Sequence, residues 1–201
     1  LSLGIDSQAR NAKAFLILEF LPHNLAPKHN ASSSSKACLI EVYFGIMAKK
    51  LDGLKLAKDI EQRLKNEISD VLVTAGRPPG LAVIRVGNDA ASEVYVSNKE
   101  RACLRVGINS FVYHLEEKTS DEELILKINE LNENKFIDGI LVQLPLPEGI
   151  NQKKILEAID PEKDADGLHT LNIGKLVKGE KGPRSCTPAG IMALLAKNQI
   201  S

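Results

Sequence analysis

The chain has 201 residues, of which 43% are hydrophobic and 26% charged, values typical of a globular domain with a buried core. Its 26 basic and 26 acidic residues cancel and aromatic residues make up only 4%, so we expect no nucleic-acid partner. No apolar run approaches the roughly 20 residues that span a bilayer, so we expect no membrane partner either.

Cysteine and histidine usage favours a reducing, cytoplasmic setting without a bound metal. The three cysteines are odd in number, lie far apart and form no C-x-x-C pair. The four histidines show no H-x-x-x-H spacing. These patterns argue against a disulfide framework and against a zinc site.

Residues 1–46 differ from the rest of the chain. They show no helical or strand period and contain four consecutive serines at 32–35. Basic residues among serines favour a transit peptide, whereas Asp6, Glu19 and Glu41 speak against one. The other interpretation is upstream sequence translated with the gene, or an artefact. We expect 1–46 to be an N-terminal extension that is disordered or artefactual, and 47–201 to form the domain.

Helix and strand patterns alternate after Met47. A helix is predicted first, because apolar residues recur at every fourth position: Leu56, Ile60, Leu64 and Ile68. Residues 81–86 then have the composition of a buried strand. A second helix is predicted over 91–105, with Gly107 as its left-handed C-terminal cap. Residues 110–114 are predicted to form the second strand.

The second half of the chain continues this alternation. Ser120 and Glu123 form a capping box for a helix that ends near 134. Residues 138–144 are predicted to form a third strand, which prolines then stop. Asn151 is expected to cap a helix that ends near 159.

The remaining sequence predicts a loop and one last helix. Residues 160–184 are predicted to be a polar loop. Thr187 is expected to be the N-cap of a helix over 189–198, with Pro188 at its first position. We expect its apolar residues to be partly exposed, namely Ile191, Leu194 and Leu195.

This order of elements predicts an α/β fold. Strands that alternate with helices indicate a mainly parallel sheet covered on both faces, which is a three-layer αβα domain. Ligands of open parallel sheets bind beyond the carboxyl ends of the strands. Three segments lie there, namely the turn after residue 86, residues 143–147, and the loop from residue 160.

Tyr95 and Lys99 lie one turn apart on one face of the second predicted helix. A partly desolvated lysine can lose its proton near neutral pH and act as a general base toward water. The tyrosine ring can stack on a flat ligand. The alternative is a solvated lysine beside a half-buried tyrosine, a pair that is common in helices.

Gln143 ends an otherwise apolar strand. A buried amide needs hydrogen-bond partners, so Gln143 can bind Lys99 and influence its protonation. The alternative is a glutamine at a strand end that faces water.

Asp164 and Asp166 occupy alternate positions before Gly167. A carboxylate matches the paired N–H donors on one edge of an aminopyrimidine ring. The alternatives are an Asx turn or a calcium-type loop, although the later oxygen ligands of an EF-hand loop are missing.

Together these segments resemble the bifunctional methylenetetrahydrofolate dehydrogenase/methenyltetrahydrofolate cyclohydrolase family in its bacterial form. The resemblance runs from about residue 51 to 195. It is carried by Tyr95-Val96-x-x-Lys99, by 138–147, by Pro161-x-Lys163-Asp164-x-Asp166-Gly167, by Asn172-x-Gly174 and by Cys186-Thr187-Pro188-x-Gly190.

The resemblance implies a folate site in one-carbon metabolism. It implies that Lys99 is the catalytic lysine, that Tyr95 packs on the folate and supports Lys99, and that Gln143 tunes Lys99. It implies that Asp166 holds the pterin ring, and that Leu144 and Pro145 contact the substrate. The implied reaction is oxidation of 5,10-methylenetetrahydrofolate with NADP, followed by hydrolysis to 10-formyltetrahydrofolate for purine biosynthesis.

The resemblance also implies a part that this sequence does not contain. Family members continue into a Rossmann-type NADP domain, and they are expected to be homodimers. No G-x-G-x-x-G fingerprint is present here. We therefore expect no cofactor-binding residue and no metal ligand in this chain, and a last helix that leads toward the missing domain. The alternative function is a truncated folate-binding module without turnover.

Overall fold

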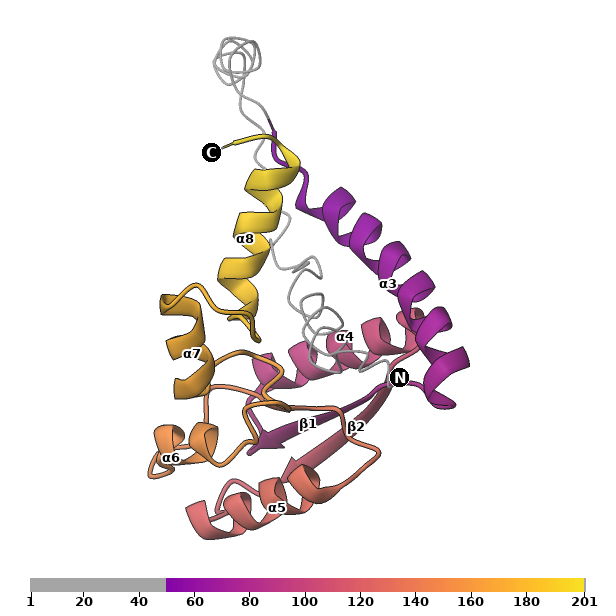
Figure 1. Cartoon of the computed structure of the whole chain (residues 1–201). Coiled ribbons are helices and arrows are strands. Elements are labelled where there is room, and N and C mark those ends of the chain that lie inside the picture. The colour runs from indigo at the N-terminus through magenta and orange to yellow at the C-terminus, as the bar shows by residue number, and fades with distance from the viewer. Residues whose placement is uncertain (1–49, 201) are drawn as a thin grey trace, which may run out of the picture.

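The computed structural model describes residues 50–200, so the expectation for residues 1–46 lies outside the described part (Figure 1). The described elements are, in order, α3 (Gly53–Ala75), β1 (Gly80–Val86), α4 (Ala90–Val106), β2 (Asn109–Leu115), α5 (Asp121–Glu133), β3 (Gly139–Val142), α6 (Gln152–Glu157), α7 (Thr170–Val177) and α8 (Cys186–Lys197).

The three strands form a parallel sheet in the order β2-β1-β3. β1 is the central strand, with Val83 opposite Val112 of β2 and Leu141 of β3. The predicted third strand, 138–144, is shorter in the structure, but ladder bonds continue at its carboxyl end, where the Gln143 N–H donates to the Ile84 carbonyl at 2.8 Å. Beyond β3, Asp164 forms an isolated parallel bridge with Ile140.

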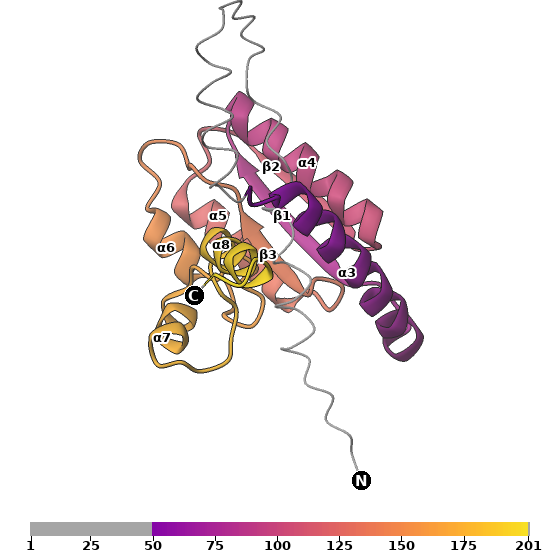
Figure 2. The same cartoon turned by 90° about the horizontal axis from the view of Figure 1, so that it is seen from above.

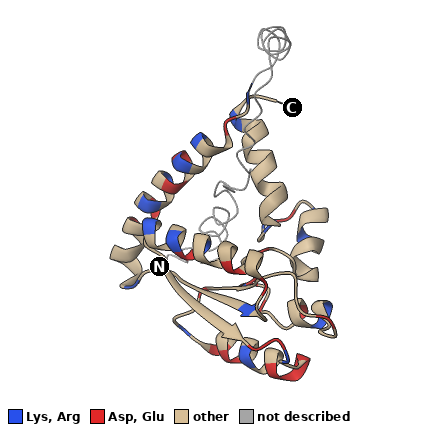
Figure 3. Cartoon of the chain, turned by 180° about the vertical axis from the view of Figure 1, so that it is seen from behind, with Lys and Arg blue, Asp and Glu red and all other residues tan. Residues whose placement is uncertain are grey.

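Helices cover both faces of the sheet, as the alternation predicts (Figure 2). Successive β1 residues point to opposite faces. Leu81 and Val83 pack in one core with the apolar faces of α3 and α4, whereas Ala82, Ile84 and Val86 pack in a second core with α5 and α6. The three-layer αβα prediction is therefore confirmed. Residues of both charge signs lie along α3 and α5 (Figure 3).

Most predicted helix boundaries are confirmed by their caps. Ser120 accepts from the Glu123 N–H while Glu123 accepts from the Ser120 N–H, so the capping box is present. Gly107 ends α4 with a φ of 89°. Asn151 accepts from the Lys154 N–H and begins α6.

The predicted loop over 160–184 was wrong, because it contains α7. This helix reverses the usual amphipathic pattern: its fully buried residue is Asn172, whereas Leu171, Ile173 and Leu176 are exposed. An apolar stripe that faces a core, the pattern that reveals most helices in a sequence, therefore does not mark this one.

The predicted start of the last helix was also wrong. α8 begins at Cys186 with Ser185 at the N-cap position, so Thr187 and Pro188 lie inside its first turn. Proline is tolerated there because the first N–H groups of a helix have no partner within it. Ile191 is exposed and Leu194 and Leu195 are partly exposed, as expected, and the buried part of Leu194 packs against the core on the α3 side.

Arg77 and Asp138 join the amino ends of β1 and β3. The guanidinium donates to both carboxylate oxygens, at 2.7 and 2.8 Å, and Asp138 also accepts from the Gly80 N–H at 2.8 Å. This bidentate pair raises the pKa of Arg77 further above its usual value. Gly80 is closely packed here, since a Cβ would lie 1.9 Å from the Phe136 carbonyl oxygen.

We predict that Gly80→Ala destabilises the domain by at least about 3 kcal/mol, because the backbone at Phe136 must move to admit a methyl group. Gly53→Ala is the matched control, since nothing lies within 4 Å of the Cβ position of Gly53. Urea unfolding followed by circular dichroism measures both variants. Equal stability of the two would contradict the close packing at Gly80.

Candidate functional site

Lys99 is a buried lysine on α4, at the carboxyl side of the sheet. Only 4% of the residue is exposed, and its Nζ donates to Oε1 of Gln143 at 3.1 Å. No ion pair within residues 50–200 includes Lys99. A buried amino group bonded to an amide rather than to a carboxylate is costly for stability alone. Lys99 is therefore the strongest candidate for chemistry in the described chain.

Gln143 is held so that its oxygen faces Lys99. Its Nε2 donates to the Leu144 carbonyl at 2.8 Å, and its own N–H donates to the Ile84 carbonyl at 2.8 Å. The side-chain amide therefore cannot turn over without losing a bond at each end. The structure brings together Lys99 and Gln143, 44 residues apart, as the sequence suggested.

Three other expected site residues border this pair. Tyr95 lies one turn before Lys99 on α4 and is 37% exposed, so part of its ring is accessible to a ligand. Leu144 and Pro145 directly follow Gln143, and the peptide bond between them is cis. Leu144 is half-buried and Pro145 is exposed.

The segment with the two aspartates lies beside β3. Ile140 donates to the Lys163 carbonyl at 2.6 Å and accepts from the Ala165 N–H at 3.1 Å. The segment runs parallel to β3, so Asp166 lies farther toward the carboxyl end than the Ile140 bridge, on the side of Gln143. Asp166 is partly exposed, whereas Asp164 is buried.

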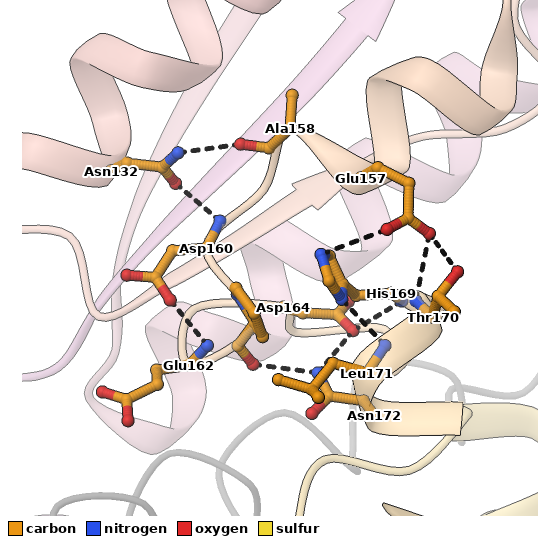
Figure 4. A network of polar contacts seen from close by, with 11 residues as sticks. Asn132, Glu157, Ala158, Asp160, Glu162, Asp164, His169, Thr170, Leu171 and Asn172 are labelled. Carbon is orange, nitrogen blue, oxygen red and sulfur yellow. Dashed lines mark hydrogen bonds and ion pairs between the residues drawn. The ribbon is translucent and has the colours of Figure 1, made fainter. Parts of the chain in front are cut away.

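A polar network under this segment was not expected from the sequence. Asn172 is fully buried and donates to Asp164 and to the Pro161 carbonyl, each at 2.9 Å (Figure 4). His169 accepts from the Leu171 N–H at 3.0 Å through Nδ1 and contacts Glu157 through Nε2 at 3.4 Å. The pKa of Glu157 is lowered, first by its hydrogen bond with the Thr170 hydroxyl. The one feature of the sequence that could have revealed this network is Asn172, a polar residue among the apolar residues of α7.

Lys163 anchors the same segment to α5. Its Nζ donates to three carbonyls at the end of that helix, those of Leu131 at 3.2 Å, Asn132 at 2.5 Å and Asn134 at 3.0 Å. Burial lowers the pKa of Lys163. A cation at a helix C-terminus also complements the helix dipole.

The profile of tetrahydrofolate dehydrogenase/cyclohydrolase, catalytic domain, matches residues 51–166, which include Tyr95, Lys99, Gln143 and Asp166. The chain belongs to this family. A bifunctional protein FolD from Prochlorococcus marinus is 61% identical over 155 residues, which are 77% of this chain and 51% of that protein. The chain therefore spans about half the length of the curated relatives that it matches.

Solved structures of the family have the same fold. The bifunctional FolD enzyme of Campylobacter jejuni is 45% identical with a TM-score of 0.72, over 75% of this chain and 53% of that one. The Trypanosoma brucei FolD enzyme, solved with NADP cofactor and inhibitor, is 35% identical with a TM-score of 0.72, over 76% and 52%.

The described residues contain neither a metal-binding cluster nor a membrane-spanning helix. Residues 50–200 hold no group of three or more His, Cys, Asp or Glu side chains that could bind a metal ion. Within the same residues, none of the helices combines the length and the apolar character that crossing a bilayer requires.

The turn after Asp166 depends on a glycine. Gly167 has a φ of 65°, and a Cβ there would lie 2.4 Å from the Arg184 carbonyl carbon and 2.7 Å from the Ser185 nitrogen. The backbone of this turn therefore rests directly on the entry to α8. Nearby, the Cys186 thiol donates to the Ala165 carbonyl at 3.5 Å.

We predict that Gly167→Ala lowers the melting temperature by roughly 6–12 °C more than Gly179→Ala. Gly179 also has a positive φ, 72°, but nothing lies within 4 Å of its Cβ position. Backbone strain is therefore similar in both variants, and the difference between their melting temperatures reports the contact with Arg184. Calorimetric melting of both measures it, and equal shifts would show that the turn tolerates a side chain.

Proposed function

We propose that this chain is the folate-binding catalytic half of a methylenetetrahydrofolate dehydrogenase/cyclohydrolase. The observation that carries the proposal is the buried Lys99 bonded to an oriented Gln143, beside the partly exposed Tyr95. The family match supports it, because residues 51–166 include all three.

In the proposed site, each residue has a separate task. Tyr95 stacks on the flat part of the folate, Asp166 accepts hydrogen bonds from the aminopyrimidine edge of the pterin, and Leu144 and Pro145 form the wall beside it. Asp166 is the carboxylate suited to binding, because it is partly exposed whereas Asp164 is buried.

Lys99 serves the hydrolytic step. Water adds to the carbon of the 5,10-methenyl cation while one proton passes from that water to the Lys99 amine. The bond from this carbon to N5 then breaks as the new hydroxyl gives up its remaining proton and becomes the formyl C=O, N5 takes up a proton, and 10-formyltetrahydrofolate results. Gln143 fixes the direction of the Lys99 amine through its Oε1, so that the remaining hydrogen-bonding capacity of the amine faces the substrate.

The described residues do not fit an NADP site. The turn between β1 and α4 has one glycine, Gly87, and its Cβ position lies 3.4 Å from Pro147 and 3.5 Å from Glu117. This turn therefore lacks the further glycines of a G-x-G-x-x-G turn, through which the backbone admits a pyrophosphate. We propose that oxidation of methylenetetrahydrofolate belongs to a longer protein of the kind seen in the relatives.

The longer protein is proposed to be cytoplasmic and homodimeric, and to supply one-carbon units for purine biosynthesis. The equal numbers of acidic and basic residues, and their mixing along the described helices (Figure 3), support a role without nucleic-acid or membrane partners.

A folate-binding module without turnover is the second candidate. It is favoured by the half-length coverage of the relatives, since residues beyond the matched half can complete an active site. Binding of 5-formyltetrahydrofolate without hydrolysis of methenyltetrahydrofolate by the same chain would select it.

We predict that Lys99→Ala lowers methenyltetrahydrofolate hydrolysis by roughly 10²–10⁴-fold, because a general base contributes about that factor. Folate affinity is expected to change only a fewfold. The decay of methenyltetrahydrofolate absorbance measures hydrolysis, in this chain or in a hybrid with the second half of the Prochlorococcus marinus relative. Lys65→Ala, an exposed lysine on α3, is the control. Hydrolysis by Lys99→Ala within a fewfold of the unaltered protein would refute the role.

We predict that this 201-residue chain binds NADP no better than an unrelated protein and produces no NADPH from methylenetetrahydrofolate. The physical reason is that the turn after β1 has only Gly87 where a dinucleotide-binding turn needs a G-x-G-x-x-G pattern. Calorimetric titration with NADP and absorbance of NADPH are the measurements. Saturable micromolar binding would place a cofactor site among these residues.

A further inference from the structure

Asp164 is a buried carboxylate at the base of the turn that carries Asp166. It is 3% exposed, and its Oδ2 accepts from the His169 N–H and from Nδ2 of Asn172, both at 2.9 Å (Figure 4). The first bond spans five residues, so it closes residues 164–169 into a small loop. Asp166 lies within this loop.

The start of the loop is fixed to the sheet and to α5. The backbone on both sides of Asp164 bonds to Ile140, and Lys163 donates to three carbonyls at the end of α5. These bonds do not involve the Asp164 carboxylate, so they remain when that carboxylate is changed. Only the closure of the loop depends on Asp164 itself.

The loop ends at His169, the N-cap of α7, and Asn172 of that helix ties the start of the loop to α7. Asn172 is 0% exposed, and its amide joins the Asp164 carboxylate to the Pro161 carbonyl. A charged acceptor serving two donors in a buried place forms stronger bonds than a neutral one. Replacing it by an amide therefore weakens the closure while the shape of the side chain is kept.

We propose that Asp164 is a positioning residue that orients Asp166 toward the pterin and does not itself contact the ligand. This inference rests on the proposed function and goes further by dividing the two carboxylates of the motif. Asp166 contributes the contact, and Asp164 contributes the conformation of the turn that presents it. The effect of Asp164 on folate affinity therefore passes through Asp166.

A double-mutant cycle tests this division. The full chain is titrated with 5-formyltetrahydrofolate, and melting is measured on the same proteins. Asp166→Ala is expected to raise the dissociation constant roughly 10–100-fold, as loss of a charge-assisted bond does, and Asp164→Asn roughly 3–10-fold. In the Asp166→Ala background, Asp164→Asn should leave the dissociation constant unchanged. It should still lower the melting temperature by the same amount in both backgrounds.

The matched control is Asp160→Asn in the same segment, since the Asp160 carboxylate accepts from the Glu162 N–H at an exposed place. Its folate affinity should equal that of the unaltered chain. If Asp164→Asn does not fold, Asn172→Ala removes one of the two donors to Asp164 and enters the same cycle.

Each outcome decides a separate question. An equal rise of the dissociation constant on Asp164→Asn in both backgrounds would overturn the positioning role and leave the folate site standing. No saturable binding by the unaltered chain would overturn the proposed function, and this inference with it.

Discussion

The pairing of β1 with β3 is the constraint on which the rest of the site depends. The ladder runs from the Asp138 N–H on the Gly80 carbonyl to the Gln143 N–H on the Ile84 carbonyl, each at 2.8 Å. α4 follows β1 directly and packs over the same sheet. Gln143 thereby reaches the side of α4 that carries Lys99. A shift of one residue in this register would turn Gln143 to the opposite face, toward α5.

Few polar residues are buried in the described part of the chain. The described core is otherwise apolar, and its buried polar residues are Ser92, Lys99, Asp164 and Asn172. Ser92 and Lys99 lie on α4, whereas Asp164 and Asn172 join the segment after α6 to α7. Burying such groups costs stability unless they are bonded, so a fold selected only for stability gains little from them. Lys99 bonds to Gln143 just past the carboxyl end of β3, where ligands of such sheets bind, whereas Asp164 pairs with Ile140 within β3.

The sequence predicted the parts of the fold that follow from apolar period and capping. The apolar run from Leu81 to Val86, the capping box at Ser120 and the glycine at 107 each have one local solution, and all are present. α7 was missed because it is fixed by a bond between a buried asparagine and an aspartate outside the helix, and not by an apolar stripe. The start of α8 was misplaced because proline is compatible with more than one position in a first turn.

The candidate site also contains features that local sequence patterns do not determine. The spacing of Tyr95 and Lys99 follows from a helix, but the bond between Lys99 and Gln143 joins residues that only the strand order brings together. By spacing alone Asp164 and Asp166 are equivalent, since both precede a glycine at alternate positions, and only the family resemblance singled out Asp166. Their difference in burial arises from α7, which the sequence did not reveal.

The choice of an amide as the partner of Lys99 has a chemical reason in the proposed reaction. A carboxylate at this place would stabilise an ammonium and oppose transfer of a proton to the lysine and away from it again. A carboxylate would also attract the cationic methenyl group of the substrate, and this attraction would not depend on the direction of the Lys99 amine. An amide oxygen accepts an N–H from either protonation state of the amine, so the lysine keeps its direction while its charge changes. Because the nitrogen of the same amide is bonded to the Leu144 carbonyl, the oxygen stays in place throughout. The pair is thus suited to a step in which a proton moves and the framework does not.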